Sequence, residues 1–247
     1  MPAADCKHAG RPALPLANNP PEYVIAPSAR PNVAVTGSMA RFPVRRIWCV
    51  GRNYADHARE MGHDPDAEPP FFFAKPADAV IDSGARIPYP PGTADFHHEA
   101  ELVVALGSGG SDVPDAAALE LVWGYGAGND LTRRDMQAAA KLARRPWDMS
   151  KGFDRSALVG PLTRAKPGQM PHGMIRAHVN GHLRQESRLS DMIWSVPALL
   201  SALSRLVALC PGDLIFTGTP AGVGPLQRGD TCVVTIDGLD AAEVQII

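Results

Sequence analysis

The sequence predicts an α+β protein whose strands form a mixed sheet. Apolar runs of strand length outnumber helical patterns along the 247 residues, and no regular helical crossovers separate them. A doubly wound parallel sheet needs a helix between successive strands. The order of elements therefore favours a mixed sheet with short helices beside it.

Composition and charge are those of an ordinary soluble globular chain. There are 24 Lys and Arg against 26 Asp and Glu, a formal net charge of −2, and 45% of the residues are hydrophobic. A protein that binds nucleic acid needs a surplus of basic residues on one face, and none is visible. No apolar run approaches the roughly 18 residues that span a bilayer. We expect neither nucleic acid nor a membrane as a partner.

The cysteines indicate a cytoplasmic location. Cys49, Cys210 and Cys232 lie in apolar contexts, where a thiol acts as a small buried hydrophobe. No CxxC pair exists, so we expect no structural zinc. The first residues carry an acid and several prolines where a secretory signal has an apolar core. These observations together predict a reducing compartment.

The first 43 residues are expected to form an extension separate from a compact domain over residues 44–247. Seven prolines fall within the first 33 residues, where they fix φ and remove backbone donors. Only residues 23–25 and 33–35 look able to pair as edge strands. From about residue 42 the sequence pattern becomes that of buried strands and short helices.

The first elements of the compact domain follow in quick succession. Residues 45–51 (RRIWCVG) are typical of a buried strand, and residues 71–76 (FFFAKP) form a second apolar run of strand length. Between them, residues 53–62 predict a short helix closed by Gly62 at the position after its last turn.

The middle of the chain predicts two strands and a helix. The strands cover residues 101–106 and 121–127, and the helix covers 130–143. Thr132 and Asp135 have the spacing of a capping box at its entrance.

The last part begins with the clearest hairpin, residues 175–180 and 182–185, whose Asn-Gly suits a type I′ turn. A helix over 196–209 follows, with Ser195 as its cap and Pro197 in its first turn. Residues 213–217, 231–236 and a final segment to 247 are expected to be strands.

Glu99 and Glu101 are candidate metal ligands. Residues two apart in an extended chain point to the same side, so two carboxylates lie side by side. Like charges at that distance are costly to bury without a cation, and a hard divalent ion, Mg²⁺ or Mn²⁺, prefers oxygen ligands. Such a pair more often faces water on an edge strand, although the apolar residues that follow count against this here. Asp130 is the best-placed third ligand, or else a helix cap.

Two helical pairs and a lysine supply candidate catalytic and binding groups. Arg134 and Gln137 share a helix face and suit an anionic, oxygen-rich molecule, although a solvated face has the same pattern. His57 and Glu60 have the spacing of a base and the carboxylate that orients it, which also arises by chance. Lys151 is either an anion anchor or an exposed lysine.

The loop GTPAGVGP, residues 218–225, is not a nucleotide motif. No GK[ST] follows it, and it does not open a helix as a dinucleotide fingerprint does. Its glycines allow the backbone to approach a ligand closely, and Thr219 offers a hydroxyl and an amide to a carboxylate. The sequence has no serine hydrolase motif in a context in which it could function.

Seven sequence blocks, in one order and spacing, resemble the fumarylacetoacetate hydrolase family. The similarity runs from about Val44 to the C-terminus and is strongest to the bacterial acylpyruvate hydrolases, among them those that cleave fumarylpyruvate. The blocks are GRNYADHAREM, FFFAKPADAV, FHHEAELVVALG, GYGAGNDLTRRDMQ, RPWDMSKGFD, VNGHLRQE and PGDLIFTGTPAGVGPLQRGD.

The resemblance implies a mixed β-roll, usually a homodimer, with a catalytic domain over residues 44–247. It implies a Mg²⁺ or Mn²⁺ site at Glu99, Glu101 and Asp130. His57 and Glu60 would be the water-activating dyad on a lid and Lys151 an active-site cation. The matching positions for substrate contacts are Arg134, Gln137 and Thr219.

The implied reaction is metal-dependent hydrolysis of the carbon–carbon bond of a 2,4-dioxo acid. Fumarylpyruvate, cleaved to fumarate and pyruvate in gentisate-type aromatic degradation, is the expected substrate. The same site could instead decarboxylate oxaloacetate, or hydrate or isomerise a dienoate, because one fold hosts several reactions. A non-catalytic carboxylate-binding protein is a further alternative, against which the intact set of candidate residues counts.

Overall fold

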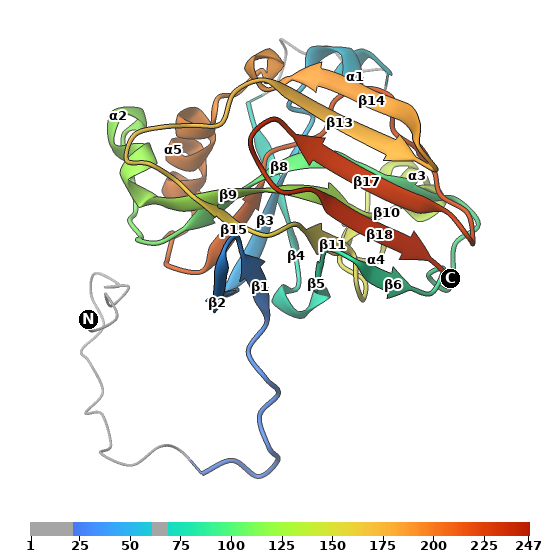
Figure 1. The fold of residues 1–247 in the computed structure, drawn as a ribbon, viewed down its shortest axis with the longest axis horizontal. Helices are drawn as coiled ribbons and strands as arrows, with labels where there is room; N and C mark the ends of the chain where they lie inside the picture. Colours follow the sequence, from blue (N-terminus) through green and yellow to red (C-terminus); the bar gives the residue numbers. More distant parts are fainter. Residues whose placement is uncertain (1–21, 61–68) are drawn as a thin grey trace.

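The computed structural model describes residues 22–60 and 69–247 and has the expected mixed-sheet architecture (Figure 1). The largest sheet has the strand order β4-β3-β15-β8-β9-β11-β5, with β12 paired to β9. Two of its pairs, β3 with β15 and β5 with β11, are parallel, and the others are antiparallel. Its strands are β3 (Arg46–Gly51), β4 (Phe71–Lys75), β5 (Val80–Asp82), β8 (Ala100–Leu106), β9 (Val122–Asp130), β11 (Ala157–Val159), β12 (Thr163–Arg164) and β15 (Asp213–Phe216).

A second sheet with the order β14-β13-β17-β18-β6 packs across the first. Alternate residues of β13 and β17 are buried, the pattern of a sheet with one face on the core. Every residue of β8 is buried, because it lies inside the molecule with core on both faces. The strands are β6 (Ala85–Ile87), β13 (Met174–Val179), β14 (His182–Arg188), β17 (Thr231–Ile236) and β18 (Ala242–Ile246).

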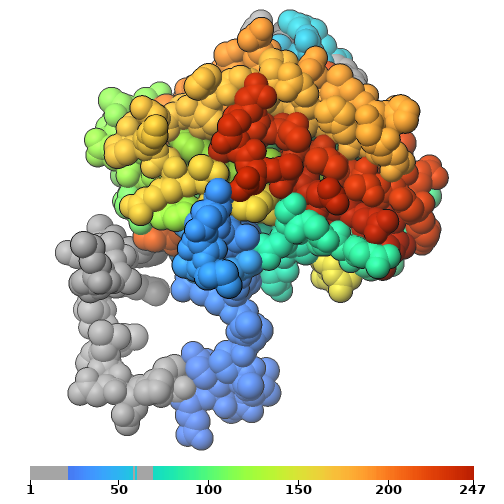
Figure 2. Space-filling view, in the orientation of Figure 1, coloured from blue at the N-terminus to red at the C-terminus, as the bar shows by residue number. Residues whose placement is uncertain are grey.

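Two small sheets complete the strands. Strands β7 (Phe96–His98), β10 (Thr132–Arg133) and β16 (Gly224–Pro225) form one of them. The other is a hairpin of β1 (Asn32–Val35) and β2 (Ser38–Pro43), which lies against the body in the space-filling view (Figure 2). Val33 and Phe42 of this hairpin belong to the second core cluster. The stretch expected to be a separate extension therefore contributes side chains to the core.

The prediction of an edge strand at residues 23–25 is wrong. Residues 22–31 contain no strand, and the side chains of Tyr23, Val24 and Ile25 are exposed. Pro27 and Pro31 have no backbone donor, so a paired strand cannot continue from this segment toward β1.

The helices are short and lie at the ends and edges of the sheets. Helices α2 and α5 lie side by side at one end, away from α3 and α4. They are α1 (Ala55–Glu60), α2 (Asp115–Ala118), α3 (Arg134–Leu142), α4 (Asp148–Lys151) and α5 (Val196–Leu206), with 3-10 turns at Ala77–Ala79, Leu119–Leu121 and Leu189–Asp191. Within the described ranges, no helix combines the length and apolarity that crossing a membrane requires.

Local predictions for the last part of the chain hold. Asn180 and Gly181 have φ values of 52° and 77°, as a type I′ turn requires, and they join β13 to β14. Ser195 caps α5 by accepting a hydrogen bond from the Ala198 N–H at 3.5 Å. The helix ends at Leu206, three residues before the predicted end at residue 209, because Val207 has an extended backbone.

The predicted capping box of α3 is wrong. Thr132 lies in β10, and its hydroxyl donates to the Asp130 carbonyl at 2.9 Å. The Asp135 carboxylate instead accepts hydrogen bonds from the Thr93 hydroxyl and the Ala94 N–H. Asp135 therefore uses its carboxylate in two tertiary contacts and does not cap the helix.

Two further local predictions concern helix α1 and the cysteines. Gly62, expected to close α1, lies outside the described residues. Cys49, Cys210 and Cys232 are all buried, as their apolar contexts predict, and the thiols of Cys49 and Cys232 are free.

Candidate active site

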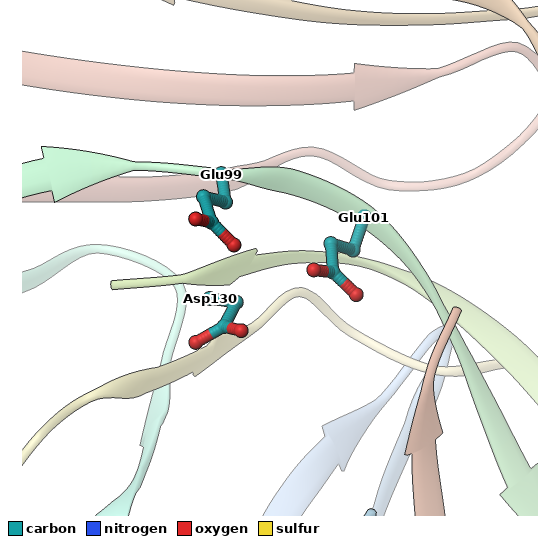
Figure 3. A group of neighbouring side chains, drawn as sticks. All are labelled: Glu99, Glu101 and Asp130. Carbon is teal, nitrogen blue, oxygen red and sulfur yellow. The ribbon is translucent and has the colours of Figure 1, made fainter. Parts of the chain in front are cut away.

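The two central strands of the large sheet bring three carboxylates together. Glu99 lies between β7 and β8, Glu101 is the second residue of β8, and Asp130 is the last residue of the antiparallel neighbour β9. Figure 3 shows the three carboxylates turned toward one another. One oxygen from each lies within 4.8 Å of the others, and all three side chains are buried. The structure therefore brings together the three residues that the sequence suggested as metal ligands.

The chemistry of this triad fits a divalent cation. Burial, together with the negative charges of Asp130 and Glu99, raises the pKa of Glu101 well above its usual range. Glu101 accepts a hydrogen bond from the Gly218 N–H at 2.7 Å, a neutral donor that does not cancel its charge. Asp130 Oδ1 is buried without a hydrogen bond. Crowded, buried carboxylates are the donor set that a hard cation such as Mg²⁺ or Mn²⁺ uses.

Gly218 can approach Glu101 only because it is glycine. Its φ of 94° is in the left-handed region, and an added Cβ would lie 2.7 Å from the Asn53 Cβ. The sequence predicted a close backbone approach to a ligand in this loop. The structure places Gly218 against a candidate metal ligand instead.

Lys151 is the counterion of the other two carboxylates. Its Nζ lies 2.7 Å from Glu99 Oε2 and 2.8 Å from Asp130 Oδ2, and it also donates to the Thr132 hydroxyl. Burial alone would raise the pKa of Glu99, but the positive charges of Lys151 and Arg134 outweigh it and hold that pKa well below its usual range. Lys151 is buried and lies in the site, so it is not an ordinary exposed lysine.

A second buried lysine, Lys75 at the end of β4, was not among the predicted residues. Its Nζ lies 2.6 Å from Asp130 Oδ1, although the angle is not that of a hydrogen bond, and it donates to the Leu131 carbonyl at 3.2 Å. Because the two charged atoms lie this close, we treat Lys75 and Asp130 as an ion pair. The apolar run that ends in this lysine is the only signal in the sequence.

His57 reaches the same site from helix α1, and its side chain is buried. Asn53, just before this helix, donates to the Thr217 carbonyl at 2.8 Å and accepts from the Trp194 N–H at 2.7 Å. These bonds hold the start of α1 against two loops. Glu60 is the last residue of α1, and its side chain lies outside the described residues.

Arg134, Gln137 and Thr219 also line the site. Arg134 donates to the Gln137 amide oxygen at 2.6 Å and forms an ion pair with Glu99. The Thr219 hydroxyl accepts from Gln185 Nε2 at 2.8 Å. Gln185, from the predicted hairpin, is buried and also contacts His98, and it is a second residue that the sequence did not reveal.

Most of these residues line one small cavity of about 30 Å³. Phe73, Trp147, Arg52 and Lys141 complete its wall beside the residues already described. The predicted residues with described side chains therefore come together in one place.

Curved mixed sheets around a buried triad of carboxylates, with lysines beside it and a histidine in the cavity wall, are the arrangement of a metal-dependent enzyme. The chain belongs to the fumarylacetoacetate hydrolase family, because the family model described as "Fumarylacetoacetate (FAA) hydrolase C-terminal" matches residues 46–247. Its fold is the one shared by that family, and it is a hydrolase that acts on carbon–carbon bonds.

Three similar proteins represent the range of the family. The crystal structure of fumarylpyruvate hydrolase from Pseudomonas aeruginosa, in complex with Mn²⁺ and pyruvate, is 49% identical and matches with a TM-score of 0.89 over 92% of this chain and 99% of that one. The fumarylpyruvate hydrolase of a Ralstonia species is 38% identical over 74% of this chain and 94% of its own length. Human mitochondrial oxaloacetate tautomerase FAHD1 is 41% identical over 80% of this chain and 92% of its own length.

Proposed function

We propose that the protein hydrolyses the bond between C3 and C4 of a 2,4-dioxo acid, with fumarylpyruvate as its substrate and fumarate and pyruvate as its products. The observation that carries the proposal is the cavity itself, which Glu99 and Glu101 of the carboxylate triad line together with several cations. The relatives named fumarylpyruvate hydrolase support this choice of substrate. In that role the enzyme would act in gentisate-type aromatic degradation.

His57 is the proposed general base. It removes a proton from water, whose oxygen attacks the C4 carbonyl, and the bond between C3 and C4 then breaks. C4 leaves as the carboxyl group of fumarate, and C3 takes up a proton as the methyl group of pyruvate. Glu60, one helical turn away on α1, is proposed to orient the imidazole.

Glu99, Glu101 and Asp130 would hold the Mg²⁺ or Mn²⁺ ion. When bound, the ion supplies positive charge for the carboxylate and 2-oxo oxygen of the substrate and for the enolate that forms as the bond breaks. Lys151, which lies between two of these carboxylates, shares in the stabilisation of that negative charge. Arg134, Gln137 and Thr219 are proposed to bind the substrate's oxygen atoms.

Oxaloacetate is the second candidate substrate. The human relative carries the name oxaloacetate tautomerase, and other solved relatives carry the names of isomerases. Tautomerisation, decarboxylation and dienoate isomerisation all pass through enolates of the kind that this site would stabilise. One fold therefore leaves the choice among these reactions to experiment.

The test measures the loss of ultraviolet absorbance as the protein acts on fumarylpyruvate. Acetylpyruvate, fumarylacetoacetate and oxaloacetate are assayed in parallel, and each substrate is tested with Mg²⁺, with Mn²⁺ and after chelation of the metal. We expect metal-dependent loss that is fastest with fumarylpyruvate and yields fumarate and pyruvate. Activity confined to oxaloacetate would replace the hydrolase proposal by the second candidate.

The assembly and location of the protein belong to the same proposal. We propose a cytoplasmic homodimer whose catalytic domain spans residues 44–247, as the family resemblance implies. Light scattering coupled to size-exclusion chromatography measures the mass in solution, and a mass of one chain would contradict the dimer.

A further inference from the structure

Helix α3 carries a third polar residue on its site-facing side, about one turn beyond Gln137 and two turns beyond Arg134. Arg134, Gln137 and Lys141 have the spacing i, i+3 and i+7, which places them on one helix face. All three line the cavity. Seven residues of helix extend about 10 Å along its axis, close to the length of an extended seven-carbon dicarboxylate. Lys141 therefore lies about this length along the helix from Arg134, whose guanidinium pairs with Glu99 of the triad.

Lys141 has no anionic partner among the described residues. Its Nζ lies 5.2 Å from the centroid of the Trp147 ring and forms no hydrogen bond or ion pair within that part of the chain. The side chain is only partly exposed. Arg134, in contrast, is occupied by Glu99 and Gln137. Lys141 thus presents an uncompensated ammonium to the cavity.

The charges around the cavity favour a ligand with two negative groups. Among the described side chains, Arg134, Lys141, Lys151 and the Lys75 behind them outnumber the three carboxylates of the triad, even before a divalent cation is added. A monoanion would leave a surplus of positive charge in a partly buried site, which is costly.

The titration of Lys141 agrees with this picture. Burial, and then the positive charges of Arg134 and Arg52, lower the pKa of Lys141 to about 8. An anion beside its ammonium would offset both effects. Arg52, whose φ of 56° places its backbone in the left-handed region, holds its guanidinium 5.1 Å from the centroid of the Phe71 ring.

We propose that Lys141 forms a second anion subsite that binds the distal carboxylate of a dicarboxylic substrate. This inference rests on the proposed function, because it takes the other end of the substrate to lie at the carboxylate triad. The subsite selects acylpyruvates whose acyl group ends in a carboxylate over those that end in a methyl group. Lys141 is thereby a specificity-determining residue.

The first experiment compares two substrates that differ at this end. Fumarylpyruvate carries the distal carboxylate and acetylpyruvate lacks it. In Lys141→Met, the ratio of kcat/KM for fumarylpyruvate to that for acetylpyruvate should fall by about 10- to 100-fold, the usual value of a hydrogen bond to a charged group. Lys141→Arg should retain most of the preference.

Lys166→Met is the matched control, because Lys166 is an exposed lysine outside the cavity. Its ratio should stay within about twofold of the wild-type value. An equal loss of activity on both substrates in Lys141→Met would overturn the subsite, since it would indicate a structural or general electrostatic role.

A binding experiment separates this proposal from the proposed reaction. Fumarate and crotonate share a carbon skeleton, but crotonate has a methyl group in place of the second carboxylate. By calorimetry with the Mn²⁺-loaded protein, fumarate should bind at least about tenfold more tightly, and Lys141→Met should remove that preference. Equal affinities in the wild type would overturn the subsite. Failure of the wild type to cleave either acylpyruvate, with the fumarate preference intact, would instead reject only the proposed reaction.

Discussion

Lys75 Nζ lies 2.6 Å from Asp130 Oδ1, and both side chains are completely removed from solvent. The two residues come from opposite parts of the large sheet, Lys75 from the end of the edge strand β4 and Asp130 from the end of β9. Lys75 also donates to the main-chain carbonyls of Leu131 and Lys151. It therefore ties the edge of the sheet to two segments that carry site residues.

Lys75→Met should destabilise the protein by about 3 kcal/mol, because removal of one partner leaves a buried charge and buried carbonyls without their donor. Urea unfolding measures this, and Lys166→Met, at an exposed lysine, serves as the control. A loss no larger than that of the control would show that the neighbouring Lys151 compensates Asp130 alone.

Glu101→Gln should make the metal-free protein more stable while it weakens metal binding. The substitution removes one of three mutually repelling carboxylates, and relief of about 1 kcal/mol corresponds to roughly 2–4 °C in melting temperature. The loss of one ligand should lower Mn²⁺ affinity by at least about 100-fold, more than the loss of an outer-shell partner. Thermal melts with and without Mn²⁺ measure both effects. A wild-type response to Mn²⁺ in the variant would move the metal site elsewhere.

His57→Ala should lower kcat by roughly 10²- to 10⁴-fold, the usual contribution of a general base, with Mn²⁺ affinity unchanged. His182→Ala is the matched control, because His182 is exposed on the hairpin at the start of β14. Steady-state kinetics on the preferred substrate and calorimetry with Mn²⁺ give the two readouts. Undiminished turnover would remove His57 from the proposed mechanism.

The carboxylate triad was predictable because its determinants are local. Glu99 and Glu101 are two residues apart in an extended segment, which fixes their common side, and the buried run that follows Glu101 indicates a central strand. Asp130 follows a second apolar run, and consecutive antiparallel strands pair as neighbours. Sequence spacing therefore placed Glu99 and Glu101 side by side and made Asp130 the candidate third ligand, while the full set came from the family resemblance.

The residues that hold the site in place were not predictable in the same way. Lys75, Asn53 and Gln185 donate hydrogen bonds to groups that lie 56, 164 and 34 residues away, at Leu131, Thr217 and Thr219. Such pairs depend on which strands and loops meet in three dimensions. The failed capping box of α3 has the same cause, because Asp135 found partners at Thr93 and Ala94 instead of at its own helix end.

Asp135 provides a prediction for the pH dependence of stability. Slight burial works in the opposite direction, but hydrogen bonds from the Thr93 hydroxyl, at 2.5 Å, and from the Ala94 N–H, at 2.9 Å, outweigh it and lower the pKa of Asp135. A carboxylate with a lowered folded-state pKa stabilises the fold above its unfolded-state pKa, and that contribution is lost as pH falls through the folded-state value. The contacts hold the turn before β7 against the start of α3, next to Arg134.

Asp135→Asn should therefore cost about 0.5–1 kcal/mol near neutral pH, at the lower end of the range for hydrogen bonds because the side chain is exposed and screened by solvent. The difference from wild type should shrink as pH falls below about 4, the ordinary aspartate range. Urea unfolding from pH 7 down to the lowest pH at which both proteins fold measures it, with the exposed Asp78→Asn as the charge-matched control. A difference that stays constant over this range would mean that the Asp135 charge contributes nothing, and that the neutral side chain makes the same contacts.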